Sequence, residues 1–405
     1  MLSSVAEDPA CWAEEFSVMF ARVAPVFASA PVRKRARSYL LGLLSQQERK
    51  NGWTIAELAG EQSPDGMQRL LNRCTWDDAQ ARAGLREYVV AQAGDPGAVV
   101  IADETGFAKK GRRSAGVQRQ YSGTLGRVEN CQIGVHLAYA VPGTGFRALI
   151  DVELYVPRSW TGDRDRCEDA GIPDDRTFAT KPELARQMLA RVIAACVPFA
   201  WFTADEAYGQ NPGLREWLET EKVKYVLVVP CSQLIETAAG KRRADELAAL
   251  VPHEAWQRLS CGDGSKGPRM FDWALVATAG PQRHLMIRRS LHPGETGKIE
   301  IAYYLCWAPR PVTLAELARV AGARWGVEDC FGETKNETGL DHYQARLYIA
   351  WYRHITLAML AHAFLAVTAA RARPPSPRQS GETLGQEPSG GHQPAREGTR
   401  PRHTL

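Results

Sequence analysis

A change of hydrophobic pattern near residue 98 constrains the fold of this chain more than any other feature of the sequence. Residues 1–93 contain short amphipathic runs with helical spacing, whereas the runs AVVIAD, CQIGVHLAYAV and ALIDVELYV that follow are β-branched or alternating, as in strands. Further along, KPELARQMLARVIAAC predicts a helix, and FAWFT and YVLVV predict strands. Strands followed by strand–helix alternation predict a mixed α/β domain with a mixed sheet.

The same patterns divide the chain into segments. We expect a helical N-terminal region over 1–93, the first part of an α/β core over 94–230, and the last part of that core over 301–370. Residues 231–300 interrupt the alternation with a glycine-rich stretch and further strand-like runs, which predicts a β-rich insertion. Residues 371–405 are rich in Pro, Gly, Ser, Gln and Arg, which predicts a disordered tail.

Composition narrows the class of protein. Hydrophobic residues make up 44% and charged residues 24% of the 405 positions, close to the globular average, which excludes a wholly disordered or fibrous chain. The net charge is only +4, so any nucleic-acid contact must come from local clusters of cations. The nine cysteines form no C-x-x-C pair, which favours a reducing cytoplasm over a disulfide framework. The apolar run 355–370 is short for a bilayer span, so we expect a core helix and no membrane association.

Two aspartates follow apolar strand-like runs. Asp103 comes after AVVIA, and Asp205 comes after FAWFTA. Active-site groups of α/β sheets lie just beyond the C-terminal ends of central strands, so two such side chains on neighbouring strands can point into one space. Aspartate is also common after strands as a turn residue or a helix cap, and this alternative holds for either residue taken alone.

A third carboxylate lies in the segment RWGVEDCFGETK. Arg324, Glu328 and Lys335 are spaced by four and seven, so on a helix with about 100° per residue they share one face. Phe331 lies beside them on the same face. The alternative is an exposed ion pair with a lysine further along the helix, which would add only about a few tenths of a kcal/mol.

Basic residues gather directly after the first aspartate. Between Glu104 and Glu129 there are six Lys and Arg residues, no acid and five glycines. A basic, glycine-rich hairpin beside a carboxylate suits contact with a phosphate backbone, although a solvated loop has a similar composition. The cations that we expect to contact DNA are Lys109, Lys110, Arg112, Arg113 and Arg119. A smaller cluster, RKRAR over 33–37, fits a solvated helix start and a DNA contact equally well.

Three separated carboxylates flanked by cations suit metal-dependent phosphoryl transfer. Carboxylate oxygens are hard ligands for Mg²⁺ or Mn²⁺. Two such ions about 3.5–4 Å apart activate a water or a 3′-hydroxyl and stabilise the leaving oxygen, while nearby cations hold phosphates. The sequence has neither a G-x-S-x-G elbow nor a Walker loop that would favour another chemistry.

Several blocks resemble, in order, those of bacterial insertion-sequence transposases of the DDE type, specifically the insertion-sequence 701 group. The blocks are DETGFAKKGRRSAGVQRQYSGTLGRVENCQIGVHLAYA, FATKPELARQML, WFTADEAYGQNPGLREWLE and RWGVEDCFGETKNETGLDHYQARLYIAWYRHITLAMLAHAFLAV, and the similarity covers roughly residues 30–370. The resemblance implies an RNase H-like catalytic core with a β-rich insertion before the last acidic residue. It also implies that Asp103, Asp205 and Glu328 form the metal-binding triad.

The wider superfamily has a Tyr-x2-Arg-x3-Glu-x6-Lys signature on the helix that carries the third acid. Arg324, Glu328 and Lys335 match this signature, and Ala321 stands at the tyrosine position. This departure puts in doubt any role of the tyrosine but not the metal chemistry.

The resemblance also implies a function. The chain would be a DDE transposase that uses two Mg²⁺ ions, or Mn²⁺ as a substitute, to cut the DNA ends of an insertion sequence and join them to target DNA. The N-terminal region would recognise the terminal inverted repeats, and the protein would self-associate on DNA at the nucleoid in the bacterial cytoplasm. Two alternatives stay open: a transposase-derived DNA-binding regulator that no longer cuts, and an RNase H-like nuclease without strand transfer.

Overall fold

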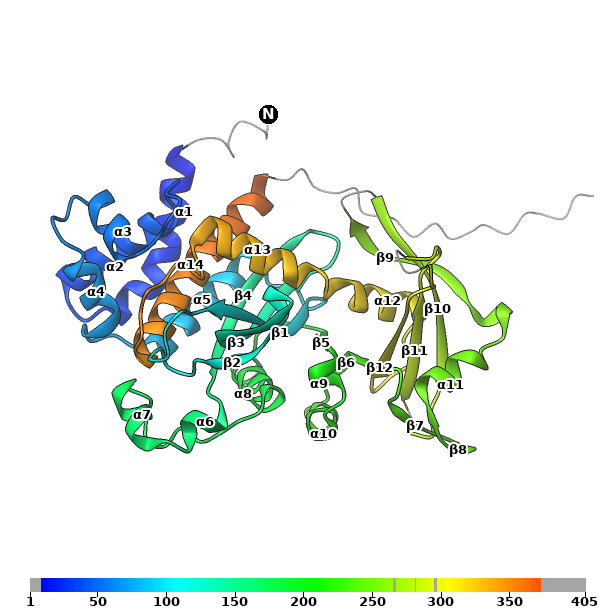
Figure 1. Ribbon diagram of the computed structural model, residues 1–405. Helices are drawn as coiled ribbons and strands as arrows, with labels where there is room; N and C mark the ends of the chain where they lie inside the picture. Colours follow the sequence, from blue (N-terminus) through cyan, green and yellow to red (C-terminus); the bar gives the residue numbers. More distant parts are fainter. Residues whose placement is uncertain (1–8, 265–266, 281, 295–296, 373–405) are drawn as a thin grey trace, which may run out of the picture. The chain divides into compact units, whose positions relative to one another are not determined.

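The N-terminal region folds into helices, as its amphipathic runs predict. The computed structural model describes residues 9–264, 267–280, 282–294 and 297–372 of the chain (Figure 1). The helices of this region are α1 (Pro9–Val23), α2 (Ala30–Leu43), α3 (Gly52–Leu58), α4 (Asp65–Asn72) and α5 (Asp78–Ala93). The side chains of Asn51 and Asp77 cap α3 and α5 by accepting backbone N–H groups of the first turn.

Ten strands of the described chain form one mixed sheet, and five of them form its core. These are β1 (Val99–Ala108), β3 (Arg127–Val141), β4 (Phe146–Tyr155), β5 (Trp201–Ala204) and β6 (Lys224–Val229). Their spatial order is β4-β3-β1-β5-β6, with antiparallel pairing from β4 to β1 and parallel pairing from β1 to β6. This mixed α/β arrangement confirms the predicted fold class, and its strand order is that of an RNase H-like core.

The remaining strands lengthen this sheet or form small hairpins. They are β2 (Gln118–Ser122), β7 (Leu234–Thr237), β8 (Gly240–Arg243), β9 (Gln257–Gly264), β10 (Gly267–Ala277), β11 (Arg283–Arg289) and β12 (Ile301–Trp307). Strand β12 pairs with β6, and β11, β10 and β9 follow outward, so the strands of segment 231–300 continue the core sheet. The pair β7–β8 forms a separate two-stranded sheet, followed by α11 (Ala244–Ala249).

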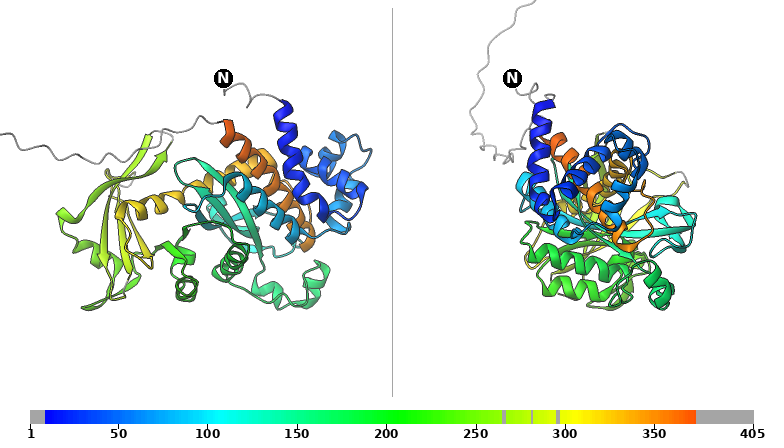
Figure 2. Two further views of the ribbon diagram at one scale, coloured as in Figure 1. Left: turned by 180° about the vertical axis from the view of Figure 1, so that it is seen from behind. Right: turned by 90° about the vertical axis from the view of Figure 1, so that its left-hand side faces the viewer.

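Helices cover both faces of the core strands (Figures 1 and 2). One face carries α8 (Lys181–Ala194), α9 (Glu206–Gly209) and α10 (Pro212–Thr220), and the other carries α5, α12 (Leu314–Ala323), α13 (Gly326–Thr338) and α14 (Tyr348–Ala372). Two short helices, α6 (Arg158–Thr161) and α7 (Arg164–Asp169), connect β4 to α8.

Helix α14 is the longest and most apolar helix of the described chain. Its length and hydropathy would suffice to cross a membrane, but most of it is buried inside the protein, as the prediction of a core helix requires. It continues two residues into the segment predicted as a disordered tail, where Arg371 pairs with Glu15 of α1. The rest of that segment, 373–405, lies outside the described residues.

Candidate active site

Asp103 and Asp205 directly follow the last paired residues of two neighbouring parallel strands. The parallel ladder between β1 and β5 ends at the pair Ala102 and Ala204, and each aspartate is the next residue of its chain segment. Burial and the charge of Asp205 raise the pKa of the Asp103 carboxyl to about 7. Burial, together with the charge of Glu104, also raises the pKa of Asp205. The structure therefore brings these two predicted site residues together.

Asp103 does not end its strand, contrary to the sequence-based expectation. Strand β1 continues to Ala108, because residues 103–108 pair antiparallel with β3 after the parallel ladder with β5 has stopped. Asp205 does follow its strand, and it also caps α9, where its Oδ1 accepts the N–H of Ala207 at 2.9 Å. The helix-cap alternative is thus correct for Asp205, in addition to its place beside Asp103.

Arg324 reaches the same place from the turn between α12 and α13. Its Nη1 lies 3.7 Å from Oδ2 of Asp103, whose side chain is only 14% exposed. The positive charge of Arg324 lowers the pKa of both aspartates and so partly offsets the effect of burial. A guanidinium beside a carboxylate pair can orient a carboxylate or bind a phosphate with the same planar group.

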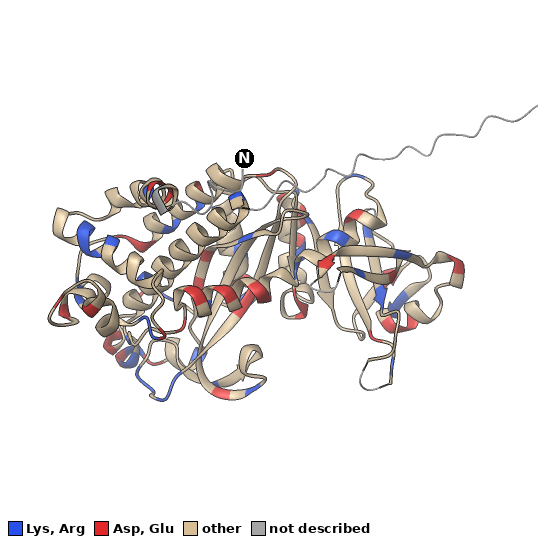
Figure 3. Ribbon diagram, turned by 90° about the horizontal axis from the view of Figure 1, so that it is seen from above, with Lys and Arg blue, Asp and Glu red and all other residues tan. Residues whose placement is uncertain are grey.

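Glu328 lies apart from this pair, on the exposed side of the first turn of α13. In the part of the chain that the structure describes, no group of three or more His, Cys, Asp or Glu side chains is arranged to hold a metal ion. Acidic residues follow one another along α13, which makes much of this helix red in Figure 3.

Glu104 is a third carboxylate near Asp205, and the sequence-based reasoning missed it. Alternation along β1 directs it to the opposite face from Asp103, where it accepts hydrogen bonds from the Lys181 ammonium of α8 and the Tyr208 hydroxyl of α9. The Tyr208 contact measures 2.7 Å between the two oxygens. The Asp-Glu dipeptide after a strand was the available signal, but its partners lie 77 and 104 residues away.

Lys335 contacts β1 two residues beyond Asp103. Its Nζ donates to Oγ1 of Thr105 at 2.7 Å. Further along the same face, the ring of Phe107 lies 5.6 Å from that of Tyr343, which follows α13. Helix α13 and the loop after it therefore run along one face of β1, and they bring the predicted cation Lys335 close to the carboxylate pair.

The predicted basic residues separate into two groups. Lys109, Lys110, Arg112 and Arg113 line a pocket of about 730 Å³ beyond the end of β1, together with residues 341–346 and Arg49. Arg119 lies on β2, exposed and outside this pocket.

Asp103 and Asp205 fit a divalent cation. Two carboxylates that are buried together raise each other's pKa, and a bound dication stabilises the charged form of both. These residues are therefore suitable metal ligands, while Glu328 could serve as a third ligand only after leaving the exposed position it has here.

Comparison with known families identifies the class of this protein. A family model described as DDE superfamily endonuclease matches residues 22–260, more than half of the chain, and a model described as transposase DDE domain matches residues 169–364. The chain therefore belongs to the DDE superfamily of endonucleases. It is also 23% identical over 311 residues to a probable transposase for insertion sequence element IS701 from Microchaete diplosiphon, with 76% of each chain covered. The predicted relationship to this group of transposases is confirmed, and membership implies DNA as the partner and divalent metal ions as the general cofactors.

Proposed function

We propose that this protein is a transposase that cleaves the DNA ends of an insertion sequence and transfers them to target DNA. The observation that carries the proposal is the pair Asp103 and Asp205, which share one buried space beside the guanidinium of Arg324. Buried carboxylates with raised pKa values and a phosphate-binding cation are the groups that metal-dependent phosphoryl transfer requires.

Different residues of the site would bind the metal ions and the DNA phosphates. Asp103 and Asp205 would hold divalent ions, and Glu328, one turn after Arg324, would join them when DNA is bound. Two bound Mg²⁺ or Mn²⁺ ions would supply activation of the attacking water or 3′-hydroxyl and stabilisation of the leaving oxygen. Arg324 would orient Asp103 in the free protein and bind a phosphate beside the cleaved bond. Lys335 would bind the DNA backbone near Thr105.

The wider reaction needs further partners. The helical region 1–93 would recognise the terminal inverted repeats, and Lys109, Lys110, Arg112, Arg113 and Arg119 would contact the DNA backbone. The protein would self-associate on DNA. The reaction would take place in the bacterial cytoplasm, where the nucleoid supplies the target.

The experiment uses duplex DNA from the two flanks of the gene, with Mg²⁺, and variants that remove a charge at nearly constant shape. Asp103→Asn, Asp205→Asn and Glu328→Gln should each lower cleavage at least about a hundredfold, more than the removal of an outer-shell partner would, while end binding persists. Asp329→Asn is the matched control, because Asp329 is exposed on the same helix and pairs with Arg147 instead. Near-normal cleavage by any of the three variants would remove that residue from the site.

The same assay separates the two alternatives. A wild-type protein that binds the ends but never nicks them is a regulator, and one that nicks them without joining them to a supplied plasmid is a nuclease. Removal of divalent ions with a chelator should stop cleavage in either enzymatic case.

A further inference from the structure

We infer that the pocket beyond the end of β1 holds the DNA backbone about five nucleotides from the cleaved bond. We call it the basic pocket: residues 108–114 after β1, residues 341–346 after α13, and Arg49 before α3. The inference rests on the proposed function, because it places DNA on the carboxylate pair. It extends that function by assigning a distinct phosphate site to three segments that are far apart in the sequence.

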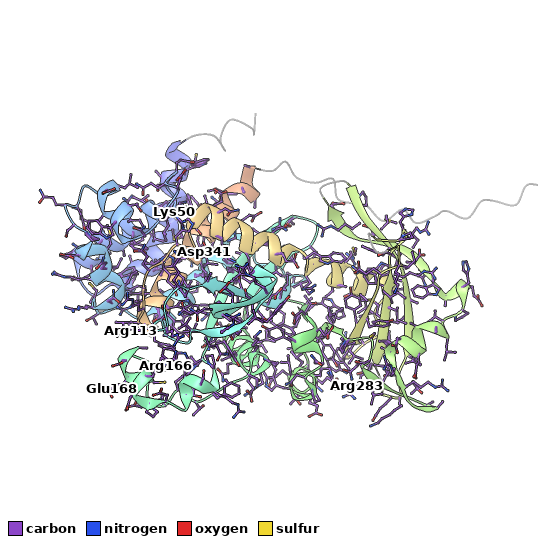
Figure 4. The ribbon with its side chains drawn as sticks, in the orientation of Figure 1. Lys50, Arg113, Arg166, Glu168, Arg283 and Asp341 are labelled. Carbon is purple, nitrogen blue, oxygen red and sulfur yellow. The ribbon has the colours of Figure 1, made fainter. Side chains whose placement is uncertain are left out.

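The charge of the basic pocket indicates an anionic ligand. Its lining contains six cationic side chains: Arg49, Lys109, Lys110, Arg112, Arg113 and Arg346. Its one carboxylate is Asp341, and Figure 4 labels Asp341 and Arg113, which come from two of the three segments. Within the described residues, none of the six cations has a carboxylate within ion-pairing distance. Gathered cations that the protein leaves unpaired attract phosphate, because phosphates release counterions when they are bound.

The ammonium group of Lys109 is held in place by contacts with another residue of the pocket lining. It lies 3.5 Å from the centre of the Tyr343 ring and 3.5 Å from the Tyr343 carbonyl oxygen. Burial lowers the pKa of Lys109 to about 8, so burial disfavours the charged form of this side chain, and a bound anion would stabilise it.

The contact between Lys109 and Tyr343 also indicates that the pocket binds the DNA backbone and not a nucleobase. The lining holds two ring side chains, Tyr343 and His342. The ammonium of Lys109 already covers the ring of Tyr343, and Nδ1 of His342 accepts the backbone N–H of Lys50 at 3.2 Å. The Tyr343 hydroxyl is also engaged, since it donates to Oε1 of Gln132 at 2.7 Å. A nucleobase could therefore stack on Tyr343 only by displacing Lys109, whereas phosphate oxygens would meet exposed guanidinium and ammonium groups.

Strand β1 sets the distance between the basic pocket and the carboxylate pair. Five residues separate Asp103 from Ala108 in an extended strand, which corresponds to about 16 Å. A DNA strand advances about 3.4 Å along the duplex axis per nucleotide, so this span is about five nucleotides. Lys335, bonded to Thr105, lies between the two places and would contact the intervening backbone.

The test scans single neutral methylphosphonates along both strands of an end duplex and measures the dissociation constant in buffer without divalent ions. Wild-type protein should bind less tightly when the substitution is at a phosphate about five nucleotides from the cut. The double variant Lys110→Gln/Arg113→Gln should bind more weakly and should no longer respond to that substitution. The dependence of log affinity on log salt should also become shallower by about 1 for each phosphate that the variant no longer binds.

The matched control is Arg127→Gln, which removes an exposed arginine of the same hairpin that pairs with Glu129 outside the pocket. It should keep the wild-type sensitivity at the same phosphate. Melting temperatures check that each variant is folded, and the variants replace exposed side chains only.

The outcomes separate the pocket from the proposed function. If the double variant keeps the wild-type response at that phosphate, or if the phosphate that it affects adjoins the cut, the inference is wrong. In a further outcome, the wild type fails to cleave in every assay, while only the double variant stops responding to a methylphosphonate several nucleotides inside the end. That result would support the DNA-binding role of the basic pocket and contradict the proposed enzymatic function.

Discussion

The two ends of helix α13 are held by different kinds of interaction. At its C-terminal end, Oγ1 of Thr338 donates to the Ala358 carbonyl at 3.1 Å, and a ring nitrogen of buried His354 lies 3.0 Å from the Gly339 carbonyl. Near its N-terminal end, Arg147 forms ion pairs with Asp329 and Glu333, whose side chains are about half exposed, and Glu333 also lies 3.5 Å from Nε2 of buried His362. Buried hydrogen bonds fix one end, while solvent screens the contacts of the end that carries Glu328.

The fixed end is attached to the N-terminal helical region. The ammonium of buried Lys50 donates to the Leu43 carbonyl at the end of α2 and to the Glu337 carbonyl at the end of α13. Gly339 ends α13 with a φ of +63°, and a Cβ there would lie 2.9 Å from Cβ of Lys50, so both the turn and the contact require glycine. The region proposed to bind the terminal repeats is thus joined rigidly to the helix that flanks the candidate site. Glu328 lies at the opposite end of the helix, where the carboxylates of the ion pairs are about half exposed.

The largest effect should come from Lys335 of this helix and Arg324 of the turn before it, two cations that contact β1. Removing a charged hydrogen bond typically costs about 1.5–3 kcal/mol, so Lys335→Ala should lower the cleavage rate by about 10- to 100-fold. Arg324→Lys should be damaging as well, because lysine lacks the planar group that suits Asp103 or a phosphate. Cleavage rates and melting temperatures measured side by side provide the check. Full activity in both variants would reduce the site to its carboxylates.

A smaller effect, on stability, should follow from releasing the fixed end. Lys50→Met keeps the volume of the side chain but leaves two helix-end carbonyls without their donor, which should cost about 2 kcal/mol. Thermal unfolding of the full chain would show it as a drop of several degrees. An unchanged melting temperature would mean that the buried end is not held more firmly than the exposed one.

The sequence predicted much of the fold and part of the site, for physical reasons. Hydrophobic periodicity located the core strands and α14, and the position of Asp205 after a buried strand placed it correctly. The sequence pattern did not reveal that β1 continues past Asp103, because residues 103–108 are kept in the strand by pairing with β3, which is distant in the sequence. The partners of Glu104 and the role of Lys50 were hidden for the same reason, since Glu104 contacts residues 77 and 104 positions away and Lys50 contacts Glu337, 287 positions away.

The buried end should also respond to acid through His354. Nε2 of this ring must donate to the Gly339 carbonyl, so Nδ1 accepts from the Tyr39 hydroxyl at 2.9 Å, and the ring is neutral. Burial lowers the pKa of His354 from 6.5 to about 4. Between these values the unfolded chain binds the proton and the folded chain does not, so the free energy of unfolding should fall by up to about 1.4 kcal/mol per pH unit on acidification.

The variant His354→Gln isolates this contribution. It should lose less stability than the wild type between pH 7 and pH 4.5, even if its melting temperature at pH 7 is lower. His136, whose pKa burial lowers to about 3, titrates in both proteins and cancels in the comparison. Parallel pH profiles would show that His354 does not carry the acid sensitivity of this end.

The smallest effect should come from the screened end. Arg147→Gln removes the ion pairs with Asp329 and Glu333, at 3.3 and 3.7 Å, but each of these carboxylates stays in contact with water. Exposed pairs contribute about 0–1 kcal/mol, so the melting temperature should change by no more than a degree or two, and less still at high salt. Apolar packing of Val327, Cys330 and Phe331 would keep this turn in place. Arg127→Gln, which breaks the exposed pair with Glu129, gives the scale of such an effect elsewhere on the surface. A destabilisation by Arg147→Gln as large as that expected for Lys50→Met would contradict the difference between the two ends.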